Sequence, residues 1–571
     1  MNRQRNFTVC ASLATFAVIA IAAQGPAPSS SASHRATSHR ALSRHQLDDE
    51  APKPRVVITA DPELDDNNTI IRAILYSSDV KLEGLIYAGS QFHWRGDGKG
   101  TTQYIPGREY TRLGLCPCTS WRFSPDEHFI DNIVDAYAGV YRNLKVHDPA
   151  YPSPAELKSK IKWGNVEFDG DFSRATDGSN LVKDLLLDDQ PGPLYVTAQG
   201  GESTIARALK SIYDQYAKTP QWGRMRDKVS HKLIIIPSGD QDGTGAAYIH
   251  PNWPDVHEYD FSGINYGYVA QSQLSPEVKP YFTPEWTLEN VTSRGPLGAL
   301  YRVWGDGKQM VTGDRTDYFG LSGYTSEQLK QMGYMVWMPP QPGGAFLGEG
   351  DTPTFINLIG NGLRAYENPQ WGGWGGRMHP GGTGFSLFGP PPPMMPPDTS
   401  GIARGLAPAG SDANNVGASQ HPRSMDLSNF HFPAVPSRTA AINARFLAAA
   451  QNDFAARLQW SVTPKFDHAN HPPAVQIKGP LAISAAPGST VRLEGAVSDP
   501  DHNQVHVTWW QYNDAGTYPG DISFSDSATL FTTFRVPDDA RAGQTISVIL
   551  EGTDNGTPPL TRYQRVTITI R

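Results

Sequence analysis

A run of acidic residues is the part of the sequence whose residue types and spacing most directly suggest chemistry. The segment Thr59-Ala60-Asp61-Pro62-Glu63-Leu64-Asp65-Asp66 carries three aspartates and one glutamate within six residues. Carboxylates this close repel one another, and a hard cation such as Ca²⁺, which prefers several oxygen ligands, would relieve that repulsion. The spacing alone also fits an Asp-rich turn that caps a helix, because aspartate is favoured near a helix N-terminus.

The elements around this run indicate an α/β fold. Continuous apolar segments at 56–58, 82–87, 194–197 and 233–237 are typical of strands buried on both faces of a parallel sheet. Segments with helical spacing of apolar residues, such as 68–78 and 203–216, separate these strands. We therefore predict a mostly parallel sheet with helices on both faces. The acidic run follows the first strand, at the end of the sheet where such folds bind ligands.

A different pattern begins near residue 471. Short alternating segments lie at 490–497, 505–512, 528–536, 545–553 and 565–570, separated by Asp, Asn, Gly and Pro turns. They predict an antiparallel, immunoglobulin-like β-sandwich over 468–571. Because Trp509 and Trp510 are adjacent on a strand, one ring should lie in the core, and the other could bind carbohydrate or contact the first domain. Asp499-Pro500-Asp501 is interpreted as a turn rather than a calcium site.

The two predicted domains are joined by a segment of unusual composition. Residues 369–410 are so dense in Gly and Pro that no regular element is expected there. Residues 440–460 then have helical spacing.

The N-terminus predicts export. Arg3 and Arg5 precede an uncharged apolar run over 7–23, the pattern of a secretory signal peptide at 1–23, with an anchor helix as the alternative. Residues 24–53 are predicted to be a disordered linker. We expect a secreted or periplasmic protein, in which Cys116 and Cys118 would be oxidised. A Cys-Pro-Cys bridge closes a very small loop, so a surface-loop pair is expected rather than a structural staple or a zinc site.

The overall composition excludes several classes of protein. A hydrophobic fraction of 39% with 10% aromatic residues is too apolar for a disordered chain. The formal net charge of -8 argues against a nucleic-acid partner. No stretch after the signal peptide is long and apolar enough for a membrane span.

The acidic run resembles the N-terminal metal motif of the nucleoside hydrolases, a strand followed by D-x-D-P-G-x-D-D. Three later segments resemble that family's second strand, middle turn and late aspartate segment: 84–89 (GLIYAG), 199–206 (QGGESTIA) and 349–353 (EGDTP). A closer resemblance, over 54–571, is to an exported bacterial family of cellulose-binding proteins with a nucleoside-hydrolase-like domain and a C-terminal sandwich. It is carried by 238–243 (SGDQDG), 295–301 (GPLGALY), 349–363 (EGDTPTFINLIGNGL), 371–377 (WGGWGGR) and 451–464 (QNDFAARLQWSVTP).

The closer resemblance implies a nucleoside-hydrolase-like domain over 54–465, with a Gly/Pro-rich extension at 369–430 and a helix at 438–460. The resemblance to the nucleoside hydrolases implies a calcium site formed by Asp61, Asp66, Asp351 and the backbone carbonyl of Gln199. Asp61 would also take a proton from the attacking water, and Asp65 would hold sugar hydroxyls.

The sequence departs from the nucleoside hydrolases around this site. Thr59, Glu63 and Ser90 stand where that family has Asp, Gly and Asn, and Gly350 stands where many members have a leaving-group His. These changes spare the implied metal ligands and alter the surroundings of the sugar and the leaving group. Nucleosides are therefore not the expected substrate.

Further candidate substrate-binding residues are Ser90, His93, Trp94, Asp240 and Asp242. His93 or Asp242 could act as an acid, with a surface histidine and a turn aspartate as the alternatives. Trp94 could stack on a sugar ring or pack in the core.

Two functional hypotheses follow from the sequence. The first is an exported, calcium-dependent hydrolase of a glycosidic bond in carbohydrate. The alternative is a non-catalytic cellulose- or polysaccharide-binding protein that retains the hydrolase fold. In a third, weaker hypothesis the sandwich is purely a structural module.

Overall fold

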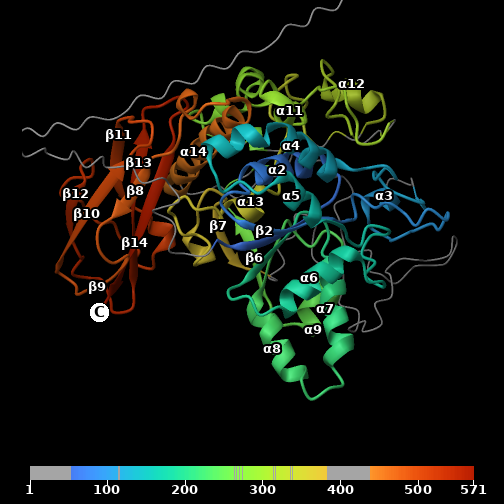
Figure 1. Cartoon of the computed structure of the whole chain (residues 1–571), viewed down its shortest axis with the longest axis horizontal. Coiled ribbons are helices and arrows are strands. Elements are labelled where there is room, and N and C mark those ends of the chain that lie inside the picture. Colours follow the sequence, from blue (N-terminus) through green and yellow to red (C-terminus); the bar gives the residue numbers. More distant parts are fainter. Residues whose placement is uncertain are drawn as a thin grey trace, which may run out of the picture. The chain divides into compact units, whose positions relative to one another are not determined.

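The computed structural model describes residues 53–381 and 437–571, apart from short gaps at 113–115, 263, 265, 269, 273, 313, 315–316, 335 and 337 (Figure 1). The predicted signal peptide, nearly all of the predicted linker and most of the predicted Gly/Pro-rich extension lie outside the described residues. Within the described part, no helix combines the length and the apolar character needed to cross a bilayer.

A seven-stranded sheet organises the first part of the chain. Its strands are β1 (Arg55–Ala60), β2 (Lys81–Tyr87), β3 (Ile161–Trp163), β4 (Leu194–Ala198), β5 (Leu233–Pro237), β6 (His257–Ser262) and β7 (Arg377–Pro380). Their order is β3-β2-β1-β4-β5-β6-β7. All neighbours are parallel except β6 and β7. The prediction of a mostly parallel sheet is therefore confirmed.

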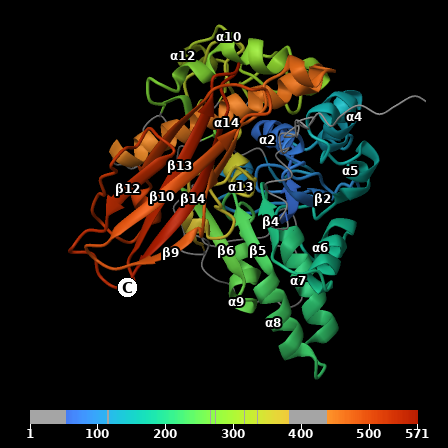
Figure 2. The ribbon, with the colours of Figure 1, turned by 60° about the vertical axis from the view of Figure 1, so that its left-hand side comes forward.

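Helices cover both faces of this sheet. The helices are α2 (Leu64–Leu75), α3 (Glu109–Arg112), α4 (Phe129–His147), α5 (Pro154–Lys160), α6 (Asp177–Leu187), α7 (Ser203–Tyr216), α8 (Trp222–Lys232), α9 (His250–Asn252), α10 (Pro284–Thr287), α11 (Gly295–Ala299), α12 (Ser326–Gln331), α13 (Thr352–Ile356) and α14 (Ser437–Val462). Figure 2 shows α6, α7 and α8 gathered on one side of the strands and α2 and α4 on the other.

The burial of strand β1 on both faces explains why its sequence is continuously apolar. Val56 and Ile58 belong to a core cluster with residues of α2, α4 and α13, whereas Val57 belongs to a second cluster with residues of α6, α7 and α8. Successive side chains of a strand point to opposite faces, so a strand covered on both faces has no solvent side. Each fully buried Val or Ile stabilises the fold by roughly 1.5–3 kcal/mol.

Helix α2 begins earlier than its apolar spacing predicts. The spacing predicts a start at residue 68, but the helix begins at Leu64, after Glu63 at the N-cap position. Leu64 is buried in a third core cluster, which holds the helix start in place. Asp65 and Asp66 therefore lie in the first helical turn, where the helix dipole favours negative charge.

The expectation that 369–410 holds no regular element is wrong for residues 377–380. These residues form β7, which pairs antiparallel with β6 in the register Phe261↔Met378. An edge strand needs hydrogen bonds on only one side, so a proline such as Pro380 is tolerated at its end. The local composition does not predict β7, because this strand forms by pairing with β6, which lies more than a hundred residues earlier in the chain.

The C-terminal region is a β-sandwich, as predicted. One sheet has the order β12-β10-β8 and the other β11-β13-β14-β9. The strands are β8 (Ala474–Ile477), β9 (Ala482–Ala485), β10 (Thr490–Ser498), β11 (Val505–Gln511), β12 (Phe531–Arg535), β13 (Thr545–Asp554) and β14 (Thr561–Ile570). The sandwich is not wholly antiparallel, because β9 pairs parallel with β14. The short strands β8 and β9 were not predicted.

The adjacent tryptophans of β11 point to opposite faces of the strand, as the strand geometry requires. Trp509 is 1% exposed in the core of the sandwich. Trp510 faces α14, where its ring lies 6.0 Å from that of Phe446 and under the guanidinium of Arg445. Of the two predicted roles for the second ring, a contact with the first domain is the one observed. Asp499 closes a turn by accepting hydrogen bonds from the backbone N–H groups of residues 501 and 503.

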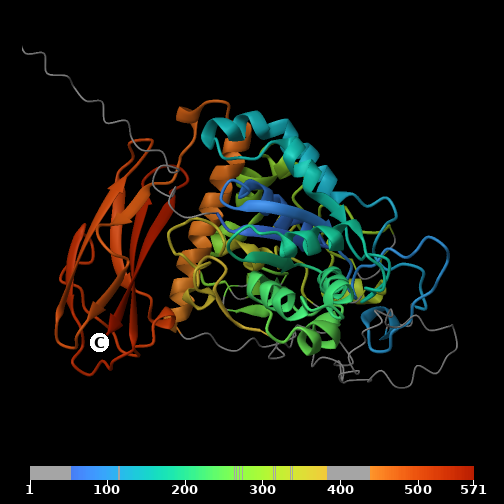
Figure 3. The same ribbon diagram turned by 60° about the horizontal axis from the view of Figure 1, so that its bottom comes forward.

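Helix α14, orange in Figure 3, lies between the sandwich and the α/β part of the chain. Phe446 on this helix packs against Tyr512 and Tyr563 of the sandwich. Tyr563 N–H also donates to the Asn361 carbonyl, and a Cβ at Gly362 would lie 1.7 Å from the Tyr563 carbonyl oxygen. Only glycine permits that approach, so the segment 361–363 is shaped to receive β14.

Cys116 and Cys118 form a disulfide. The expected surface-loop pair is only partly at the surface, because Cys116 is buried in a cluster with Trp94, Tyr110 and Trp121. The apolar surroundings come from a loop that pairs back on itself through the Trp94↔Trp121 bridge. This contact links residues 27 positions apart, so the local sequence did not reveal it.

Candidate active site at the carboxyl end of the sheet

Three separate segments bring acidic residues together at the carboxyl end of β1. Asp61 follows β1 directly, Asp65 and Asp66 lie in the first turn of α2, and Asp351 is the N-cap residue of α13. Hydrogen bonds fix the arrangement. Asp61 N–H donates to Asp66 Oδ1 over 3.0 Å, and the N–H of Gly350 donates to Asp65 Oδ2 over 3.0 Å.

The side chains form two overlapping groups with metal-ligand spacing. Potential ligand atoms of Asp61, Glu63 and His93 lie within 4.8 Å of one another, as do those of Glu63, Asp65 and Asp66. Asp351 adjoins this set, because the N–H of the preceding Gly350 bonds to Asp65, and repulsion from Asp65 adds to burial in raising the pKa of Asp351. The predicted ligands Asp61, Asp66 and Asp351 thus lie near one another, and Glu63 and His93 join them.

Several carboxylate oxygens in this cluster are buried and accept no hydrogen bond. They are Asp61 Oδ2, Asp65 Oδ1 and Asp66 Oδ2, on side chains of which Asp65, at 7%, is the most exposed. A buried oxygen without a donor carries the full cost of losing water. The donor set therefore fits a hard divalent cation, which binds carboxylate oxygens.

The pKa values of several carboxyls in the cluster are raised. Burial, followed by repulsion from Asp351 and Asp61, raises the pKa of Asp66 well above its ordinary range. Burial raises the pKa of Asp65 to about 6, although hydrogen bonds from Tyr268 and Gly350 act against the rise. The pKa of Asp351 is raised well above its ordinary range by burial and by Asp65. Burial and mutual repulsion therefore act in the same direction on these carboxylates.

The middle turn contains Gln199, whose backbone carbonyl is a predicted metal ligand. Gln199 follows β4 and is buried, and its carbonyl oxygen accepts a 2.9 Å hydrogen bond from Gln241 Nε2. A Cβ at Gly200 would lie 2.9 Å from Asp61 Oδ2, and one at Gly201 would lie 2.2 Å from Asp242 Oδ2. The two glycines therefore let this turn pass between Asp61 and Asp242.

The segment after β2 places His93 inside the cluster. Ser90 Oγ accepts hydrogen bonds from the backbone N–H groups of Phe92 and His93, so Ser90 shapes the turn. His93 is fully buried, with Nδ1 3.0 Å from Asp61 Oδ1, and the alternative of a surface histidine is wrong. Trp94 is also fully buried, against Tyr110 and Phe168, which favours packing over sugar stacking.

Asp240 and Asp242 lie on the other side of the Gly200–Gly201 turn and have structural partners. Asp242 is fully buried and accepts from the N–H of Ser203, at the start of α7, and from Thr244. Asp240 accepts from the N–H groups of Gly245 and Ala246. Burial and repulsion from Asp242 raise the pKa of Asp240 to about 6. The contacts of Asp242 are therefore those of a turn aspartate, which was the alternative to a role as an acid.

Sequence reasoning gave no role to two residues that contact the cluster. Glu63 belongs to the acidic run and replaces a family glycine, and the Tyr268 hydroxyl donates to its Oε1 over 3.2 Å. Behind the cluster, Arg72 of α2 pairs with Glu349, which precedes Gly350 and Asp351. The position of Glu63, two residues after Asp61, could have identified it from the sequence as a further acidic ligand. The contact of Tyr268 arises only in the folded chain.

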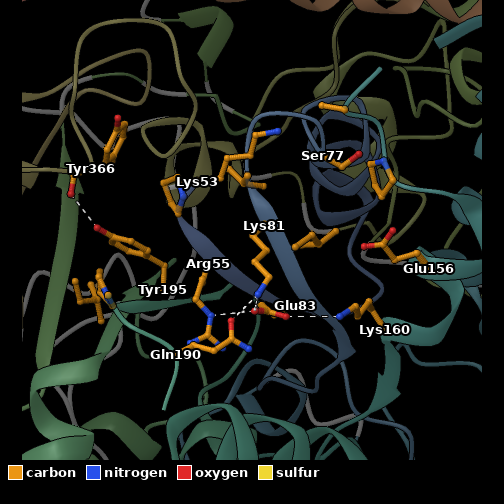
Figure 4. A pocket seen from close by; sticks show the side chains of 18 of the residues that line it. Lys53, Arg55, Ser77, Lys81, Glu83, Glu156, Lys160, Gln190, Tyr195 and Tyr366 are labelled. Carbon is orange, nitrogen blue, oxygen red and sulfur yellow. Dashed lines mark hydrogen bonds and ion pairs between the residues drawn. The ribbon is translucent and has the colours of Figure 1, made fainter. Parts of the chain in front are cut away.

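The largest cavity we describe is at the opposite, amino end of the sheet and has a volume of about 1210 Å³. Figure 4 shows Arg55, Lys81 and Lys160 converging on Glu83, and the hydroxyl of Tyr195 reaching Tyr366. The charged groups around Glu83 are therefore already paired within the protein. This cavity is distinct from the acidic cluster.

Comparisons with known proteins agree with this architecture. A family model described as "Cellulose-binding Sde182, nucleoside hydrolase-like domain" matches residues 55–378, and one described as "Cellulose-binding protein Sde0182, C-terminal domain" matches residues 490–570. No curated protein matches the chain.

Among solved structures, a nucleoside hydrolase-related hypothetical protein from Saccharophagus degradans, described as associated with carbohydrate metabolism, is 23% identical. The match covers 91% of this chain and 100% of that chain, with a TM-score of 0.59. At this identity it shows a shared fold. Human CDH23 EC21-23 is 23% identical over 17% of this chain and 33% of that chain, but a TM-score of 0.13 supports no structural argument.

Proposed function

Because the chain belongs to the cellulose-binding Sde182 family with a nucleoside hydrolase-like domain, we propose that it is an exported, cation-dependent hydrolase of a glycosidic bond in carbohydrate. The observation that carries this proposal is the buried set of Asp61, Asp65, Asp66 and Asp351, in which three carboxylate oxygens accept no hydrogen bond from the described residues. Binding sites for hard cations have this composition.

The residues that would hold Ca²⁺ are Asp61, Asp66, Asp351 and the Gln199 carbonyl. When bound, the ion would supply positive charge that offsets the carboxylates and polarises water. Asp61 Oδ2, which accepts no hydrogen bond, is the oxygen available to take a proton from the attacking water. Asp61 Oδ1 is held from the other side by the Glu63 N–H at 3.2 Å.

Asp65 is proposed to hold sugar hydroxyls. Its Oδ2 accepts from the Gly350 N–H, whereas Oδ1 meets the criteria of a hydrogen bond with none of the described residues. A Cβ at Gly350 would lie 2.5 Å from Asp65 Oδ2, so the residue at this position cannot be the bulky histidine found in many nucleoside hydrolases unless Asp65 moves. This contact supports a carbohydrate other than a nucleoside as the substrate.

The test is hydrolysis of a panel of oligosaccharides and nucleosides, with Ca²⁺ and with a chelator. We expect turnover of at least one oligosaccharide, loss of turnover with chelator, and loss in Asp61→Asn. Absence of turnover across the panel, or full turnover by Asp61→Asn, would contradict the proposal.

A second candidate function is polysaccharide binding without catalysis. The observation that favours it is the large amino-end cavity, which includes Tyr141, Tyr195, Tyr259 and Tyr366 in its lining and is separate from the acidic cluster. Tyrosine combines an apolar ring face with a polar hydroxyl, which suits sugar rings. Retention on insoluble cellulose by wild type and by Asp61→Asn alike, without turnover by either, would favour this function.

A further inference from the structure

The contact between His93 and Asp61 is close. Nδ1 of His93 lies 3.0 Å from Oδ1 of Asp61, the distance of an ion pair when the imidazole is protonated, and the geometry of a directional hydrogen bond to a described residue is not met. Both side chains are fully buried. The two atoms belong to a group of potential ligand atoms that lie within 4.8 Å of one another, so both could bind the same cation.

The other ring nitrogen of His93 indicates which tautomer is present. Nε2 lies 3.3 Å from the sulfur of Met310. A thioether sulfur can only accept a hydrogen bond, so this contact favours a proton on Nε2. The contact with Met310 occupies Nε2, so Nδ1, which faces Asp61, is the ring nitrogen left for a metal.

Glu63 completes the group. Its Oε2 lies 3.9 Å from His93 Nδ1, and its side chain is 23% exposed, whereas those of Asp61 and His93 are fully buried. Glu63 also belongs to the second group, with Asp65 and Asp66. This glutamate therefore connects two adjacent sets of ligand atoms and forms the side of the cluster nearest to solvent.

The charge of the whole cluster leaves room for more than one cation. A single divalent ion offsets two of the five carboxylates of Asp61, Glu63, Asp65, Asp66 and Asp351. Arg122 is the positive group that acts on Glu63, and it already lies 3.0 Å from Asp314.

We propose that Asp61 Oδ1, Glu63 and His93 Nδ1 form a second cation position, beside the proposed calcium position, that selects a divalent transition metal such as Zn²⁺. Imidazole nitrogen is a ligand for zinc and other transition metals, whereas calcium takes oxygen ligands. The inference rests on the proposed cation-dependent site, because Asp61 serves both positions through different oxygens. The nucleoside-hydrolase motif has glycine where this chain has Glu63.

The test is titration of the metal-free full-length protein with Zn²⁺ by calorimetry in the presence of saturating Ca²⁺, and with Co²⁺ by visible absorption. We expect one equivalent of Zn²⁺ to bind and Co²⁺ to give ligand-field bands. In His93→Asn, Zn²⁺ affinity should fall about tenfold or more, with Ca²⁺ affinity changed much less, because only the transition metal favours the imidazole. His250→Asn is the matched control, since His250 pairs with Glu258 elsewhere and should leave Zn²⁺ binding unchanged.

The proposal is overturned if wild type binds neither Zn²⁺ nor Co²⁺, or if His93→Asn binds Zn²⁺ as wild type does. If His93→Asn does not fold, Glu63→Gln replaces it, and wild-type Zn²⁺ affinity in that variant also overturns the proposal. These outcomes are separate from a failure of the proposed function, which would appear as absent Ca²⁺ binding and absent turnover.

Discussion

The two ends of the parallel sheet both carry buried charge, but only the amino end balances it. At the amino end, Arg55 lies 2.9 Å from Glu83 and 2.7 Å from Asp188, and Lys81 and Lys160 also reach Glu83. Burial acts to raise the pKa of Glu83, yet hydrogen bonds from Lys81 and Arg55 bring it below its ordinary value.

At the carboxyl end, burial and neighbouring charges act together and raise the pKa values of several carboxyls. Burial raises the pKa values of Asp65, Asp66 and Asp351, and neighbouring carboxylates add to the rise. The comparison teaches that burial of charge does not by itself mark a functional site. The mark is buried charge that the protein leaves uncompensated, because such groups are retained where a ligand completes them.

The largest expected effect is on catalysis. With an oligosaccharide that wild type hydrolyses, Asp61→Asn should lower kcat about 10²–10⁴-fold, because the amide cannot take a proton from water. Asp188→Asn makes the same chemical change at the amino end and should leave kcat per folded molecule unchanged. Equal losses in the two variants would show that the ends of the sheet do not differ in the proposed way.

The next largest effect is on stability at the amino end. Arg55→Met leaves Glu83 and Asp188 with fewer positive partners, and breaking a buried ion pair in this way typically costs about 3–5 kcal/mol. Urea unfolding should show a fall in the free energy of unfolding within that range. A change below about 1 kcal/mol, as seen for exposed pairs, would mean that this end is not a compensated network.

A change of opposite sign is expected at the carboxyl end. Without divalent cations, Asp66→Asn should raise the free energy of unfolding by about 1 kcal/mol, because it removes a buried charge that other carboxylates repel. The variant retains an Oδ1 that can accept from Asp61 N–H. Unfolding in chelator measures the effect, and destabilisation of Asp66→Asn under these conditions would argue against uncompensated charge.

The smallest effect is on acid sensitivity. The pKa values of Glu83 and Asp188 are lowered in the folded protein, by hydrogen bonds from Lys81, Arg55 and Lys232 that outweigh burial. Carboxylates of this kind contribute stability above their ordinary pKa near 4, and that stability is lost as the pH falls through the folded-state values. The Tm of wild type should therefore drop more steeply below about pH 4 than that of Glu83→Gln. A parallel pH profile for the two proteins would contradict the assignment.

The parts of the fold that the sequence predicted are those with local signals. The strands near 56–58 and 233–237 and the helix at 203–216 follow from continuous or periodic apolar residues. Strand β7 and the parallel pairing of β9 depend on partners far along the chain, so no local pattern predicts them.

The candidate site was predictable to a similar extent. The acidic run and the resemblance identified Asp61, Asp65, Asp66 and Asp351, and folding brings them together. The burial of His93 against Asp61 depends on the turn shaped by Ser90 and on Met310, which lies 217 residues away. Hence its position beside the carboxylate emerges only from the folded chain.

The most direct test of the central claim is calcium binding by the purified full-length protein, measured by calorimetry and elemental analysis after removal of metal. The uncompensated cluster predicts at least one tightly bound Ca²⁺, and predicts that Asp66→Asn loses this binding while Asp188→Asn keeps it. Absence of Ca²⁺ binding at millimolar concentration, or equal binding by both variants, would contradict the claim that the carboxyl end of the sheet is a cation site.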